Sequence, residues 1–253
     1  MISPHMRYDK LEEKRKEITK ALKTNNLQKL ISLNNAYVRD FPDDYFGWNI
    51  NGIISEKRED FAESLNHYTK AEKLNNKHLN VKINISRIFL RLSNTDNAIK
   101  KLREVILLDN KNIQAYDLLS KIYYIQKNYS KTIQVLSKAI EIDQDNIVFL
   151  ERIGLSYFIL RQFDKAKIYF ENLISLCPDI FNHHFNLGNI NYNLGKMTEA
   201  IISYSKALKI ESKSIALIAL NEAFRDSNLR YQDFASEIDL FNSSIKDTVV
   251  IKN

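Results

Sequence analysis

Residues 181–214 have the sequence FNHHFNLGNINYNLGKMTEAIISYSKALKIESKS, and this stretch decides the fold. Its apolar residues recur at helical spacing on both sides of a short turn at Leu194-Gly195-Lys196. Such a pattern predicts two helices of about a dozen residues each, joined tightly. Gly188 lets the two helices pack closely, so the stretch predicts a helix–turn–helix unit.

The same unit returns every 34 residues along the chain. Gly154 follows Gly52 by 102 residues, which is three times 34, and Gly188 comes 34 residues later. Pro42 and Pro178 lie 136 residues apart, which is four times 34. A fixed period of this kind is the sequence signature of a repeat architecture, in which stacking buries apolar faces that no unit can bury alone.

The units predict one array with a short segment at each end. We expect residues 1–10 to form a leader, residues 249–253 a tail, and residues 11–248 a single array of six units and a degenerate terminal unit. The predicted bounds of the units are 11–44, 45–78, 79–112, 113–146, 147–180, 181–214 and, for the terminal unit, 215–248.

The terminal unit differs from the others in the size of its side chains. Phe234 and Phe241 stand where the preceding unit has the small residues Ala200 and Ala207. Bulky side chains at these positions block the close approach of a further helix. We therefore expect 215–248 to act as the cap that a repeat array needs at its end.

The motif residues resemble the tetratricopeptide repeat family, whose 34-residue unit follows the pattern W-x2-L-G-x2-Y, then A-x3-F, then A and P. The residues that carry the resemblance are Trp48, Gly52, Leu150, Ile153, Gly154, Tyr157, Ala166, Phe170, Pro178, Leu187, Gly188, Ala200, Tyr204 and Ala207. The resemblance covers nearly the whole chain and implies an all-α, right-handed α-solenoid of stacked helix-turn-helix units. Lys82 at the tryptophan position and Thr95 at the turn aromatic predict that 79–112 is the least stable interior unit.

Charge and composition exclude several classes of protein. The net charge is +6, but Lys and Arg alternate with Asp and Glu, which predicts a solvated surface rather than the clustered basic face of a nucleic-acid-binding protein. The single cysteine, Cys177, excludes an intrachain disulfide and fits a reducing compartment. The N-terminus lacks the apolar core of a signal peptide, and the apolar runs are too short to cross a bilayer. We expect a cytoplasmic protein that neither binds nucleic acid nor inserts into a membrane.

The sequence holds no constellation of residues that predicts catalysis, a metal site or a cofactor. His183 and His184 are adjacent, and neighbouring helical side chains point about 100° apart, so the two cannot chelate one metal ion. His184 falls at the tryptophan position of its unit, which predicts packing in the core. Cys177 precedes Pro178 at a helix end and is expected to be a small apolar filler rather than a nucleophile. We therefore expect no enzyme activity and no cofactor.

In the tetratricopeptide family the first helix of each unit lines a concave groove, and the resemblance carries this role to the first helices here. Basic residues would attract the carboxylates of a ligand, asparagine amides would hold a peptide backbone, and aromatic rings would add rigid contact area. Because Asn is abundant throughout the chain, a merely solvated helix face explains the asparagines equally well. The predicted peptide-binding residues are Arg87, Arg91, Lys121, Arg152, Asn182, Phe185, Asn186, Asn189, Tyr192 and Asn193.

These observations predict a non-enzymatic scaffold for protein–protein interaction that binds a partner peptide in the groove. An alternative is the accessory or substrate-recognition region of a glycosyl- or sulfotransferase-type enzyme system. It rests on residues 41–57, FPDDYFGWNINGIISEK, which resemble bacterial arrays that are in some cases fused to such domains. A further alternative is self-association through the terminal units, where Phe234 and Phe241 would be exposed.

Overall fold

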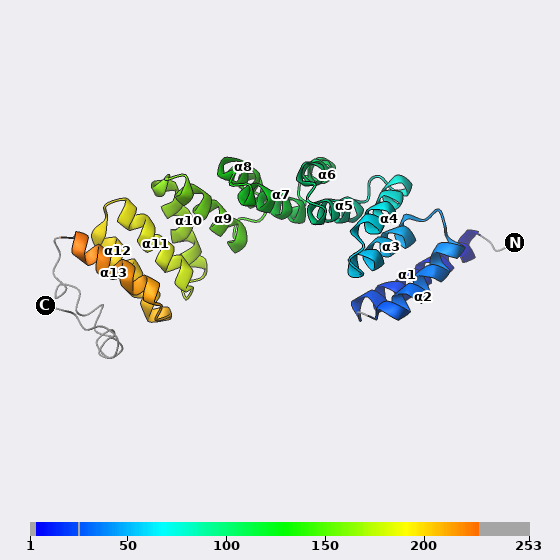
Figure 1. The fold of residues 1–253 in the computed structure, drawn as a ribbon, viewed down its shortest axis with the longest axis horizontal. Coiled ribbons are helices and arrows are strands. Elements are labelled where there is room, and N and C mark those ends of the chain that lie inside the picture. Colours follow the sequence, from blue (N-terminus) through cyan, green and yellow to red (C-terminus); the bar gives the residue numbers. More distant parts are fainter. Residues whose placement is uncertain (1–3, 25, 228–253) are drawn as a thin grey trace. The chain divides into compact units, whose positions relative to one another are not determined.

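A computed structural model describes residues 4–24 and 26–227, and this part of the chain is helical with no strand in it. It holds thirteen α-helices that follow one another along each unit (Figure 1). Their bounds are α1 Pro4–Lys23, α2 Leu27–Asp40, α3 Tyr45–Lys57, α4 Phe61–Leu74, α5 Leu79–Arg91, α6 Thr95–Leu108, α7 Ile113–Ile125, α8 Tyr129–Ile140, α9 Ile147–Ile159, α10 Phe163–Leu176, α11 Phe181–Asn193, α12 Met197–Ile210 and α13 Ser214–Asp226.

From α2 to α12, connectors of three residues within a helix pair alternate with connectors of four or six residues between pairs. Three residues join α3 to α4, α5 to α6, α7 to α8, α9 to α10 and α11 to α12.

The first helix, α1, begins at Pro4, inside the segment for which a leader is predicted. Proline suits the first turn of a helix because the missing N–H would have no intrahelical partner there.

One backbone turn recurs in these five three-residue connectors. Its second residue has a positive φ angle, and these residues are spaced by 34: Glu59, Ser93, Lys127, Arg161 and Gly195. The next residue donates its N–H to the carbonyl five positions earlier, for example Asn94 to Phe89 at 2.7 Å. This is the Schellman arrangement that satisfies the last carbonyls of a helix. The side chain of Asn94 also caps the following helix by accepting from the N–H of Asn97 at 3.4 Å.

The chain divides into two units between Ile122 and Tyr123, within α7. In the N-terminal unit, buried side chains of α4 pack against buried side chains of α5, among them Tyr68, Val81 and Ile85. Gly52 of α3 faces the ring of Tyr68, and a Cβ atom at Gly52 would lie 2.5 Å from it. The glycine phase of the repeat therefore marks a point of close helix packing.

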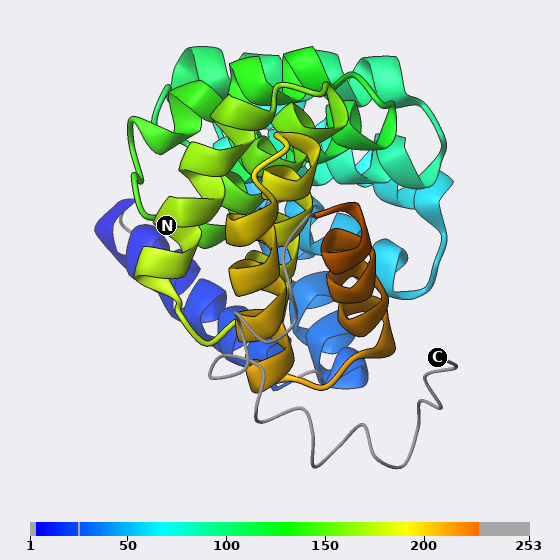
Figure 2. The same ribbon diagram turned by 90° about the vertical axis from the view of Figure 1, so that its left-hand side faces the viewer.

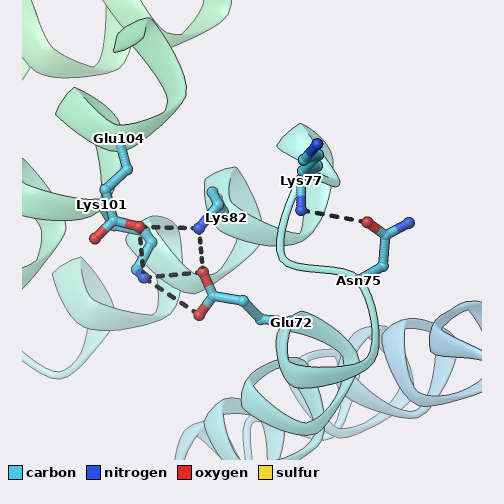
Figure 3. Close-up of polar contacts among 6 residues, drawn as sticks. All are labelled: Glu72, Asn75, Lys77, Lys82, Lys101 and Glu104. Atoms are coloured by element: carbon cyan, nitrogen blue, oxygen red, sulfur yellow. Dashed lines mark hydrogen bonds and ion pairs between the residues drawn. The ribbon is translucent and has the colours of Figure 1, made fainter. Parts of the chain in front are cut away.

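An ion cluster centred on one buried lysine joins α4, α5 and α6 in the N-terminal unit (Figure 3). Lys82 is only 6% exposed, and its Nζ donates to Glu72 at 2.6 Å and to Glu104 at 2.9 Å. Lys101 donates to the same two carboxylates, in each case at 2.9 Å. Burial alone would lower the pKa of Lys82, but the hydrogen bonds to Glu72 and Glu104 raise it. The cluster explains how a lysine occupies a position where the repeat pattern has tryptophan.

The C-terminal unit repeats the same packing. A Cβ atom at Gly188 of α11 would lie 2.5 Å from the ring of Tyr204 on α12. The α13 helix buries Ala216, Leu220 and Ala223 in the core that it shares with α11 and α12. Figure 2 shows α12 and α13, yellow and orange, side by side, in agreement with their extensive packing contacts.

The predicted cap is described only in part. Helix α13 ends at Asp226, and Phe234, Phe241 and the tail 249–253 lie outside the described residues. The division into a leader, a single array, a cap and a tail stays a prediction. Among the described helices, none is both long and apolar enough to cross a membrane.

Candidate functional site

The ten predicted groove residues are divided between the two units. Arg87 and Arg91 lie on α5 and Lys121 on α7, all in the N-terminal unit. Arg152 lies on α9, and the other six residues lie on α11, in the C-terminal unit. Each unit therefore has its own candidate surface.

In the N-terminal unit, α1, α3, α4 and α5 surround a pocket of about 440 Å³. Such a volume lies within the range of about 300–1,000 Å³ that is usual for ligand sites. Arg87 and Arg91, one helical turn apart, both line this pocket, whereas Lys121 does not. The lining consists of Leu22, Ile53, Glu56, Lys57, Glu59, Phe61, Tyr68, Asn84, Arg87 and Arg91.

The two arginines of the pocket form only long-range contacts with neighbouring side chains. Nη2 of Arg87 lies 4.0 Å from Oε1 of Glu56, and half of the Arg87 side chain is exposed. The guanidinium of Arg91 lies 6.0 Å from the ring centre of Phe61, and Arg91 has no ion pair within the described residues. Lys121, by contrast, is bound to Asp117 of its own helix at 2.7 Å.

Glu56 is held in the pocket from the other side by Tyr68. The hydroxyl of Tyr68 donates to Oε2 of Glu56 at 3.0 Å. Burial, together with the charge of Glu56, raises the pKa of Tyr68, so the phenol keeps its proton and remains a donor. Sequence reasoning did not select Tyr68 or Phe61 as pocket residues, because both fit the apolar stripe of a second helix.

In the C-terminal unit, half of the asparagines predicted on α11 are used internally. Oδ1 of Asn189 accepts from the hydroxyl of Tyr204 at 2.8 Å, and Nδ2 of Asn193 donates to the carbonyl of Asn189 at 2.8 Å. Asn182 is exposed and Asn186 is half-buried, and neither has a hydrogen bond within the described residues. Two amides of the four thus remain available for a ligand.

The two aromatic residues of α11 are also partly engaged. The ring of Phe185 stacks on Phe181 at 5.6 Å and lies 5.8 Å from Tyr204. The hydroxyl of Tyr192 donates to the carboxylate of Asp226 on α13, and this hydrogen bond raises the pKa of Tyr192. Both side chains remain partly exposed, so they offer apolar edges rather than free rings.

The remaining chemistry-bearing residues are built into the helix packing. His184 is 6% exposed and its Nε2 lies 2.7 Å from the carbonyl oxygen of Pro178, which confirms the predicted core position. Arg152 is half-buried on α9, and its carbonyl accepts from Ser156 at 2.6 Å. Over the described residues, no group of three or more His, Cys, Asp or Glu side chains could hold a metal ion.

The helix pairs and their recurring turn define an all-α helical repeat solenoid. The family model for the tetratricopeptide repeat matches residues 113–146, 149–180 and 184–214, so these residues form three tetratricopeptide repeats and the resemblance predicted from the sequence is confirmed. A comparison with curated proteins finds no match.

Several solved structures share the fold. A crystal structure of MamA has 20% identity and a TM-score of 0.60, covering 74% of this chain and 97% of that chain. A crystal structure of YrrB, described as a TPR protein with an unusual peptide-binding site, has 12% identity and a TM-score of 0.64, covering 75% and 97%. MamA from residue 41 onward, from Desulfovibrio magneticus, has 16% identity and a TM-score of 0.57, covering 65% and 93%. At these identities the likeness shows the fold alone.

Proposed function

We propose that the protein is a non-enzymatic interaction scaffold that binds a peptide segment of a partner protein on the exposed faces of its first helices. The observation that carries the proposal is the pocket beside α5, where Arg87, Arg91 and Asn84 line about 440 Å³ of accessible space. All three belong to the helix face that the family pattern assigns to the groove. The peptide-binding site named for the YrrB structure supports this class of ligand.

The chemistry of the ligand follows from the kinds of side chain on these helix faces. In the N-terminal unit, Arg87 and Arg91 attract carboxylates, and Lys121, which is paired with Asp117 at 2.7 Å, contributes less. In the C-terminal unit, Arg152 adds charge on α9. The α11 face offers amides at Asn182 and Asn186, internally bonded amides at Asn189 and Asn193, and apolar edges at Phe185 and Tyr192.

The proposed partner is a protein in the cytoplasm. A single cysteine fits a reducing compartment, and the mixed charge pattern favours protein over nucleic acid as the partner. The accessory role beside a transferase-type enzyme stays a prediction, which a neighbouring transferase gene would support. Self-association through Phe234 and Phe241 also stays a prediction, because these residues lie outside the described part of the chain.

Peptide arrays test the proposal directly. Overlapping peptides from proteins captured by the full chain would be measured against the wild type and against Arg87→Glu/Arg91→Glu. We expect the bound peptides to lose about tenfold or more in affinity, equivalent to about 1.4 kcal/mol. Lys73→Glu/Lys77→Glu is the matched control, because both lysines are exposed and lie outside the pocket. Equal losses in the two variants, or an array with no bound peptide, would contradict the proposal.

A further inference from the structure

We infer that Glu56 competes with the carboxylate of the ligand for Arg87. The pocket beside α5 then selects a segment in which a carboxylate lies next to an aliphatic side chain. The inference rests on the proposed function and adds the ligand chemistry and a built-in restraint on binding. On this view the ligand carboxylate takes the place of Glu56 beside Arg87.

The first step is that the contact between Arg87 and Glu56 is loose. Charge-assisted hydrogen bonds of this kind are usually about 2.7–2.9 Å long. Elsewhere in the same unit, Arg15 and Asp44 approach to 2.6 Å, whereas Arg87 and Glu56 lie 4.0 Å apart. Arg87 therefore keeps most of its capacity to donate, and its half-exposed side chain can reach an incoming carboxylate.

The second step is that Glu56 is held near Arg87 by Tyr68 without forming a close ion pair with the guanidinium. Its Oε2 accepts from Tyr68, a fully buried residue whose ring cannot follow a moving partner. Its Oε1 points to Arg87 at a distance that leaves the two charges attracted but not bonded. A ligand carboxylate at Arg87 would meet the negative charge of Glu56, so Glu56 must weaken ligand binding unless it is displaced or neutralised.

The third step concerns the rest of the pocket. Leu22, Ile53 and Phe61 form its apolar part, and a volume of about 440 Å³ exceeds what a carboxylate alone can fill. Arg91 lies one turn beyond Arg87 and has no ion pair within the described residues, so a second guanidinium faces the same space. Asn84 adds an amide whose Nδ2 donates to Asn49 at 3.2 Å, which orients its oxygen. An acidic residue beside a leucine or isoleucine fits this combination.

The carboxylate could come from an acidic side chain or from a chain terminus, and three fluorescent peptides distinguish the sources. The first has a blocked terminus and an internal glutamate, Ala-Leu-Glu-Leu-Ala-amide. The second replaces glutamate by glutamine, and the third is the glutamine peptide with a free carboxyl terminus. Binding is measured by fluorescence anisotropy with the full chain. We expect one carboxylate peptide to bind at least about threefold more tightly than the neutral peptide, a difference within the range of exposed ion pairs.

The competitor role is tested by Glu56→Gln, which removes the charge and keeps an acceptor for Tyr68. Glu59→Gln is the matched control, because Glu59 lines the same pocket and has no ion pair with Arg87 in the described structure. We expect Glu56→Gln to raise the affinity for the carboxylate peptide about two- to fivefold, and Glu59→Gln to raise it clearly less. The affinity for the neutral peptide should change equally in the two variants.

The outcomes separate this inference from the proposed function. Equal gains in Glu56→Gln and Glu59→Gln, or no preference for a carboxylate peptide, overturn the inference while peptides from the array can still bind. If none of the three peptides binds to the wild type or to either variant, the inference fails whatever the array shows. Matching thermal unfolding curves for the two variants establish that both are folded as the wild type.

Discussion

The packing of α11 on α12 gives a sharp prediction for Gly188→Ala. A Cβ atom at this position would lie 2.5 Å from Cδ1 and from Cε1 of the Tyr204 ring. The ring is 2% exposed and its hydroxyl donates to Asn189 at 2.8 Å. Phe185 lies against the ring as well, with 5.8 Å between the ring centres. Because the ring is held at several points, it cannot move aside without breaking contacts.

The magnitude follows from two opposing effects. Replacing a glycine inside a helix by alanine gains about 1 kcal/mol from helix propensity. Carbon atoms in contact prefer a separation of about 3.5–4.0 Å, so the new methyl group would be about 1 Å too close, and overpacking of this kind costs about 1–3 kcal/mol or more. Because the ring is held on several sides, we expect the cost to exceed the gain and the variant to be destabilised by up to about 2 kcal/mol, even though alanine is the better helix former.

Urea unfolding, followed by hydrogen exchange of residues 181–210, measures the loss. A double-mutant cycle with Tyr204→Leu isolates the contact, since the methyl group should be neutral or stabilising once the ring is gone. Gly195→Ala serves as the control for backbone strain, because nothing lies within 4 Å of a Cβ atom there, while its φ of +72° costs alanine about 1–2 kcal/mol, a loss that should not depend on the Tyr204 ring. An equal loss with and without the Tyr204 ring would refute the steric explanation.

The remaining predictions concern charged groups of the N-terminal unit. Lys82→Met should lower the free energy of unfolding by about 1–3 kcal/mol, because two carboxylates would then share one lysine, and thermal unfolding checks it. Burial raises the pKa of Glu104, but hydrogen bonds from Lys82 and Lys101 outweigh it and lower this pKa below 4.5. The stabilisation from Glu104 is therefore present above pH 4.5 and is lost as the pH falls through the lowered pKa. The free energy of unfolding of the wild type should fall more steeply in acid than that of Lys82→Met. Burial and, to a lesser extent, the charge of Arg15 lower the pKa of His78 below 6.5. Stability is therefore lost as the pH falls from 6.5 through the lowered pKa. Urea unfolding at a series of pH values should show a flatter dependence for His78→Phe. Hydrogen exchange should show the least protection of any interior unit at 79–112, and the highest protection there would contradict the sequence prediction.

The sequence predicts the helix pairs because the period places small residues at the points of contact. Gly52, Gly154 and Gly188 recur at one phase, and in the structure a Cβ atom at any of them would lie less than 3.0 Å from an aromatic ring. No such signal marks the recurring turn, since glycine occupies its positive-φ position only at Gly195 among the five described turns. Glu59 or Arg161 would not be predicted in this conformation from residue type alone. The 34-residue spacing of the five positive-φ residues becomes apparent only once the structure is known.

The candidate site is predicted less well, because availability depends on partners from other helices. Helical spacing assigns Asn189 to the inward face of α11, but spacing cannot show that a tyrosine of α12 already donates to it. In the same way, Arg87, Glu56 and Tyr68 come from three helices, and their distances decide which of them is free. Repeat patterns specify where a side chain lies on its helix, whereas hydrogen bonding across helices specifies whether it can still bind.

This distinction changes which surface is the stronger candidate. Six of the ten residues predicted from the sequence, four asparagines and two aromatic residues, lie on α11. In the structure, Asn189, Asn193 and Tyr192 form internal hydrogen bonds, and a ligand would have to replace bonds that are already made. At α5 a ligand would instead meet Arg87 at a loose 4.0 Å contact and Arg91 beside a pocket of about 440 Å³. Since a new charge-assisted hydrogen bond stabilises a complex most where the protein does not already supply one, the pocket beside α5 is the better place to look for the partner's anchor.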